Sequence, residues 1–167
     1  MNTILDGSLE QTFQKLIDKA MERREIDLSP FAEKYILTTI SDLSSEAHQL
    51  VSRPLVITDL IHRGMEADGY VRIEYLRMAG DTALFVSGIF PDSIQVSRHY
   101  FNFGDYLDLG QKAYSNINNQ IFDELADKFP ELVDLLNSVS SEIKLTSNDF
   151  KRYVLRRRFI DERITCG

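Results

Sequence analysis

Residues 71–90 read VRIEYLRMAGDTALFVSGIF, and the fold class depends on whether they form one helix or two strands. Val71, Ile73 and Tyr75 alternate with polar residues, as they would in the first strand of a β-hairpin that turns at AGD. All neighbouring segments carry helical periodicity, however, and no third strand is available. A two-stranded hairpin alone is only marginally stable in water. We therefore expect a helix here and an all-α fold.

Apolar side chains recur at helical spacing on both sides of this stretch. Ser8, Ser29 and Thr146 stand where they can cap helices, and Pro30 suits a first helical position. The patterns predict helices over residues 9–20, 30–50, 58–78, 106–125, 130–143 and 146–160. The chain of 167 residues is thus expected to form one compact domain, 1–167, built as a single bundle of six to seven helices.

Two Gly-Asp steps repeat one pattern, GDTALF at 80–85 and GDYLDL at 104–109. Glycine can close one helix in the left-handed conformation, and aspartate can accept hydrogen bonds from the free amides of the next helix. The pattern therefore predicts that Asp81 and Asp105 are N-caps.

Four aromatic residues precede or follow the second step within RHYFNFGDYLDLG, residues 98–110. We expect Tyr100, Phe101 and Phe103 to pack over the junction between two helices. Six of the eight glycines lie between residues 64 and 110, and Gly110 with Ala113 indicates a close helix crossing. The alternative is a pocket lined by residues 60–117, with candidate contacts from Arg98, His99, Tyr100, Tyr106 and Tyr114.

The composition, with 43% hydrophobic and 27% charged residues, is that of an ordinary globular protein. The single cysteine, Cys166, excludes an internal disulfide framework and fits the reducing cytoplasm. The N-terminus lacks the apolar core of a signal peptide, and no run of 18 uncharged apolar residues predicts a membrane span. A cytoplasmic location is therefore expected.

Charge is distributed unevenly along the chain. The net charge of −7 disfavours non-specific nucleic-acid binding by the whole molecule, yet residues 146–167 hold six Lys or Arg residues against three acids. This segment is predicted to be a basic C-terminal helix, with a candidate docking site at Arg156, Arg157 and Arg158. The favoured interpretation is that its arginines pair with the acidic body of the same chain, and the alternatives are contact with a protein partner or, less favourably, with nucleic acid.

Motifs that would carry chemistry are absent from the sequence. There is no Gly-x-Gly-x-x-Gly, no P-loop lysine, no Gly-x-Ser-x-Gly and no Glu-x-x-His. His62 and Glu66 lie one helical turn apart, but a surface ion pair explains them better than a metal site. We expect no cofactor, no metal and no catalytic residue, which disfavours an enzyme.

The stretches GDTALFVSGIFPDS and YLDLGQKAY resemble a family of uncharacterised bacterial proteins, over roughly residues 75–117. The matching residues are Gly80, Asp81, Leu84, Phe85, Gly88 and Phe90, followed by Tyr106, Gly110, Ala113 and Tyr114. The resemblance implies a bacterial cytoplasmic protein and a helix at 71–90, and it implies no activity.

Taken with the composition, these patterns favour a helical protein-interaction or self-association module, with a homodimer as one form. The alternative is a small-molecule binding protein or enzyme with a pocket between the helices of residues 60–117.

Overall fold

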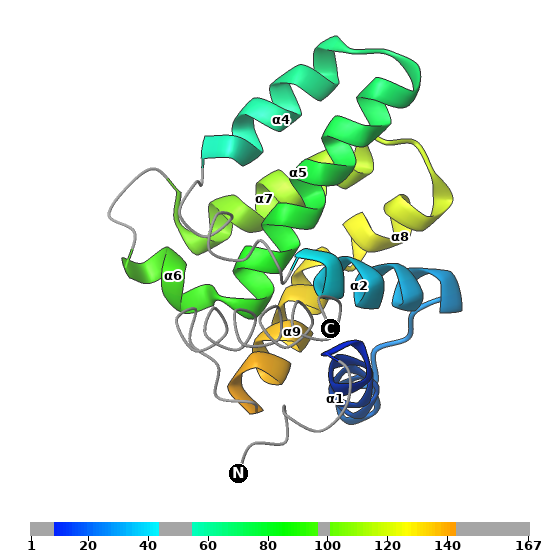
Figure 1. Ribbon diagram of the computed structural model, residues 1–167, viewed down its shortest axis with the longest axis vertical. Coiled ribbons are helices and arrows are strands. Elements are labelled where there is room, and N and C mark those ends of the chain that lie inside the picture. Colours follow the sequence, from blue (N-terminus) through cyan, green and yellow to red (C-terminus); the bar gives the residue numbers. More distant parts are fainter. Residues whose placement is uncertain (1–8, 44–54, 97–100, 143–167) are drawn as a thin grey trace, which may run out of the picture.

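The computed structural model of the chain describes residues 9–43, 55–96 and 101–142 (Figure 1). Within these three ranges the chain forms helices and no strands, which confirms the all-α class. In chain order the helices are α1 (Leu9–Arg24), α2 (Pro30–Leu43), α4 (Leu55–Glu66), α5 (Gly69–Ile89), α6 (Pro91–Val96), α7 (Phe103–Ser115), α8 (Gln120–Asp127) and α9 (Phe129–Glu142). The described ranges alone contain more helices than the six to seven expected. The predicted helix over 106–125 is divided into α7 and α8, and α6 was not predicted.

Helix α5 runs through the middle of the bundle (Figure 1). It packs along α4, α7 and α9, so it contributes to most of the core. Its second half is buried on all sides, which removes the amphipathic pattern that a surface helix would show. The first half forms a hairpin with α4, at the end of the molecule that is uppermost in Figure 1.

The helix predicted over 71–90 is confirmed, but its predicted boundaries are wrong. The expected helix at 58–78 is divided at Ala67 and Asp68, where Gly69 takes a positive φ of 59°. That conformation favours glycine and lets the chain reverse between α4 and α5. No helix ends at Gly80. An added Cβ there would lie 2.3 Å from Cε1 of Tyr114, so Gly80 serves close packing inside the helix.

Asp81 is therefore not an N-cap, since it lies in the interior of α5. Asp105 is not the cap of α7 either. Asn102 is the cap: its side chain accepts a hydrogen bond from the Asp105 amide at 2.9 Å, while Asp105 Oδ2 accepts from the Asn102 amide at 2.8 Å. This reciprocal capping box satisfies two backbone donors. The predicted cap at Ser29 is confirmed, because its Oγ accepts from the Ala32 amide at 3.2 Å.

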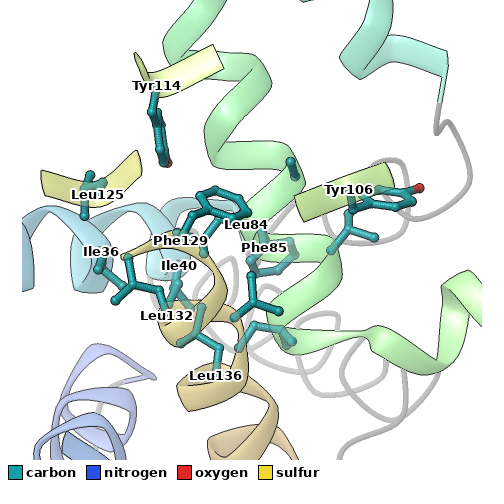
Figure 2. Close-up of a cluster of buried hydrophobic side chains, with 14 of the residues drawn as sticks. Ile36, Ile40, Leu84, Phe85, Tyr106, Tyr114, Leu125, Phe129, Leu132 and Leu136 are labelled. Carbon is teal, nitrogen blue, oxygen red and sulfur yellow. The ribbon is translucent and has the colours of Figure 1, made fainter. Parts of the chain in front are cut away.

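The apolar residues of α2, α5, α7, α8 and α9 meet in one core, where Ile36, Leu84, Phe85, Phe129 and Leu132 lie close together (Figure 2). Two glycines allow the helices to approach. A Cβ on Gly110 would lie 2.0 Å from Cζ of Phe129, and one on Gly88 would lie 2.7 Å from Cδ1 of Leu136. The predicted close crossing at Gly110 is confirmed, with α9 as the neighbour.

Several predicted features lie outside the described residues. These are the cap at Ser8, the end of the predicted helix 30–50, and the basic helix over 146–167. The candidate contacts Arg98, His99 and Tyr100 and the candidate docking residues Arg156, Arg157 and Arg158 lie there too.

Candidate functional site

A buried carboxylate lies at the centre of the described bundle. Asp81 is 3% exposed, and both of its oxygens accept hydrogen bonds. Oδ1 accepts from the hydroxyl of Tyr35 on α2 at 2.7 Å and from that of Tyr114 on α7 at 2.6 Å. Oδ2 accepts from Nη1 of Arg77 at 2.9 Å. We call these four residues the Asp81 cluster; it joins α2, α5 and α7.

The cluster continues to the surface along one side of α5. Arg77 lies one helical turn before Asp81, and Glu74 lies three residues before Arg77, so all three side chains share a side of the helix. Arg77 Nη2 lies 3.0 Å from Glu74 Oε2. The Arg77 and Glu74 side chains are 33% and 35% exposed, against 4% for Asp81. A line of paired charges thus leads from solvent to the buried carboxylate.

Aromatic rings enclose the cluster. The ring of Tyr35 meets that of Phe122 edge-on at 5.1 Å. Tyr114 is fully buried and packs against Phe122 at 5.4 Å and Phe129 at 5.8 Å. These contacts, in the range where aromatic pairs attract, keep water away from the Asp81 oxygens. The exposed part of the cluster is limited to Tyr35 and Arg77, which lie on its outer side.

Burial governs the protonation of the cluster. The loss of solvent raises the pKa of Asp81 to about 6, although the three donors act in the opposite direction. Burial also raises the pKa values of Tyr35 and Tyr114, so both hydroxyls remain protonated donors. The Glu74 carboxylate raises the pKa of Arg77, which stays charged. Asp81 is the group that titrates near neutral pH.

The raised pKa of Asp81 predicts a pH-dependent stability. Between about pH 4 and pH 6 the folded protein retains a proton on Asp81 that the unfolded chain has released. The part of the stability that comes from this retained proton is therefore fully present below about pH 4 and is lost as the pH rises to about 6. A rise from 3.8 to about 6 is worth at most about 3 kcal/mol, at about 1.4 kcal/mol per pH unit.

Denaturant titrations of the wild type and Asp81→Asn across pH 4–7 measure this effect, and the difference between them removes the contributions of the other carboxylates. The free energy of unfolding of the wild type should fall relative to the variant as the pH rises. Parallel curves would show that Asp81 titrates normally. A difference of the opposite sign would show that the hydrogen bonds outweigh burial.

The buried polar atoms of this cluster are hydrogen-bonded to one another. Among the described residues, every buried side-chain nitrogen and oxygen has a hydrogen-bond partner. The buried part of the Asp81 cluster therefore offers no unpaired donor or acceptor to a ligand, and its chemical effect is to fix α5 against α2 and α7. Sequence reasoning identified Tyr114 as a polar contact, but it gave Tyr35 and Arg77 no role.

The structure does not bring the two described candidate contacts, Tyr106 and Tyr114, together in one site. Tyr114 belongs to the Asp81 cluster, whereas Tyr106 is 4% exposed and meets the ring of Phe101 at 6.2 Å. Phe101 and Phe103 pack against the core, as expected for a helix junction. His62 and Glu66 form an exposed pair at 3.4 Å on α4.

A surface hollow of about 530 Å³ lies elsewhere, between α1 and α9. Its charged side chains are paired across it, Arg24 with Asp134 and Lys19 beside it with Glu142. Asn137, Ser138 and Ser141 complete the lining. The hollow lies outside the range 60–117 in which a pocket was predicted.

The described residues contain no group of three or more His, Cys, Asp or Glu side chains that could hold a metal ion. None of the described helices has both the length and the apolar character needed to cross a membrane. No family model, curated protein or solved structure matches the chain.

Proposed function

We propose that this chain is a helical protein-interaction module whose contact surface is the exposed side of the first half of α5. The surface consists of Tyr70, Val71, Ile73, Glu74, Arg77 and Met78, and we call it the α5 face. The observation that supports it is the gathering of exposed apolar side chains there. Of six large hydrophobic residues that are exposed in the described part of the chain, four lie within these nine positions of one helix.

The exposed fractions are large for such residues. Tyr70 is 75% exposed, Val71 54%, Ile73 37% and Met78 44%. Single exposed apolar residues are ordinary on protein surfaces, whereas a contiguous group indicates a surface that a partner covers. The opposite side of the same segment packs normally, since Leu76 and Ala79 are fully buried. The apolar residues on the α5 face are thus additional to those that the fold needs.

The Asp81 cluster gives this surface a rigid base. Arg77 belongs to both, because its guanidinium contacts Glu74 on the α5 face and Asp81 beneath it. A surface that is already ordered loses little conformational entropy when a partner binds. The same internal pairing favours an interaction module over the alternative, a small-molecule binding protein or enzyme, since a ligand would need unpaired polar groups.

Methionine oxidation tests the proposal without knowledge of the partner. Met78 on the α5 face and Met65 on α4, outside the face, have nearly equal exposure, 44% and 42%. In dilute purified protein, both should oxidise at similar rates under mild peroxide. In intact cells that produce the protein, a bound partner should slow Met78 at least about threefold relative to Met65, by mass spectrometry. Equal slowing of both would contradict the proposed contact surface.

A further inference from the structure

We infer that the partner of the α5 face is a second copy of this chain, bound with the two α5 helices antiparallel. This inference rests on the proposed function and names its partner. It follows from the order of charges and apolar side chains on the face, which are complementary to themselves when one copy is reversed.

Helix geometry determines which residues would meet. Tyr70, Glu74 and Arg77 follow one another at spacings of four and three residues, so they form a seam along the helix. Val71 and Met78 lie seven residues apart on one flank of that seam. When two copies cross antiparallel at the level between Tyr75 and Leu76, Glu74 of each lies level with the partner's Arg77. Val71 of each then lies two residues, about 3 Å along the helix axis, from the level of the partner's Met78.

This arrangement has the reciprocity that a two-fold interface requires, because each contact occurs twice. It places two opposite-charge pairs at the centre and two apolar pairs on the flank. A parallel arrangement would instead set Glu74 against the partner's Glu74 and Arg77 against the partner's Arg77, and such like-charge pairs are destabilising. The charges are already held in place, since Glu74 and Arg77 are paired within the chain at 3.0 Å.

The expected dimer is weak. One helix face per copy covers less than the roughly 800 Å² per partner that typical stable interfaces bury. The chain also carries a net charge of −7, so two copies repel each other over longer distances. Dissociation constants in the micromolar range are therefore expected, and the dimer should appear only as the concentration rises.

Sedimentation equilibrium from about 5 to 500 µM tests the partner. The wild type should fit a monomer–dimer equilibrium, and Val71→Glu should raise the dissociation constant at least about tenfold. Phe31→Glu, which adds the same charge at an exposed aromatic residue outside the α5 face, should leave it unchanged. Circular dichroism checks that all three chains are folded.

Disulfide trapping tests the antiparallel arrangement. On a Cys166→Ser background, chains with Val71→Cys and chains with Met78→Cys should form a disulfide-linked pair when mixed under oxidising conditions. Neither should link to itself, because identical positions are offset along the antiparallel helices by more than a disulfide spans. Self-linking of either single variant would show a parallel dimer and overturn the arrangement.

The two proposals fail in different ways. A wild type that remains monomeric at about 500 µM would overturn the second copy as partner, while protection of Met78 in cells would still support the α5 face. A dimer that Val71→Glu does not weaken would overturn the inferred interface. Unprotected Met78 in cells would overturn the proposed function.

Discussion

Replacing Asp81 with alanine is expected to lower the free energy of unfolding by about 3–4 kcal/mol at neutral pH. The substitution removes the acceptor of three donors at once. It leaves the buried hydroxyl of Tyr114, the hydroxyl of Tyr35 and one side of the Arg77 guanidinium without their partner. Unsatisfied buried donors cost more than the hydrogen bonds themselves contribute, which explains the size of the effect. Chemical denaturation followed by circular dichroism measures it.

The chain offers a matched control in the second Gly-Asp step. Asp105→Ala removes a capping contact at the start of α7, and such a change costs about 1 kcal/mol. Tyr35→Phe and Tyr114→Phe each remove one donor from Asp81 and should each cost about 1–2 kcal/mol. Equal losses for Asp81→Ala and Asp105→Ala would mean that the buried cluster contributes no more than a surface cap.

Replacing Gly110 with alanine is expected to destabilise the fold by at least about 3 kcal/mol. The added Cβ would lie 2.0 Å from Cζ of Phe129 and 2.6 Å from two other atoms of that ring. The ring cannot move away easily, because Phe129 is fully buried and packs on Tyr114. Relief of the overlap requires α7 and α9 to separate, which opens the core.

Gly104→Ala in the same helix is the control. A Cβ there would lie 3.3 Å from Oδ1 of Asn102 and from no other described neighbour within 4 Å. Thermal and denaturant unfolding should place this variant within about 1 kcal/mol of the wild type. If Gly110→Ala is equally mild, the crossing of α7 and α9 is looser than the structure indicates.

The helix over 71–90 could be predicted because the alternative hairpin had no third strand to pair with. The ends of the helices could not be predicted, since they depend on contacts between residues that are far apart in the sequence. Residues 106–125 carry one continuous apolar pattern, yet the chain reverses at 116–119, where Asn118 has a positive φ of 59° and Asn119 caps α8. The asparagine-rich SNINN was the available signal for that turn.

The site was less predictable than the fold. Gly80-Asp81 and Gly104-Asp105 are identical dipeptides with opposite surroundings, and local sequence cannot distinguish them. The hydroxyls that bind Asp81 come from 46 and 33 residues away. The alternation of Val71, Ile73 and Tyr75 is the sequence signal of the α5 face. It is also the pattern of a strand, and in the helix it leaves Val71 and Ile73 exposed.

Whether a partner covers the α5 face is measured by the ratio of Met78 to Met65 oxidation in cells, compared between the wild type and Val71→Glu. We expect a low ratio for the wild type. Val71→Glu should restore the ratio of the dilute purified protein, because a charge within the apolar part of the contact releases the partner while the fold remains. A wild-type ratio in cells equal to that of the purified protein would show that no partner covers the α5 face.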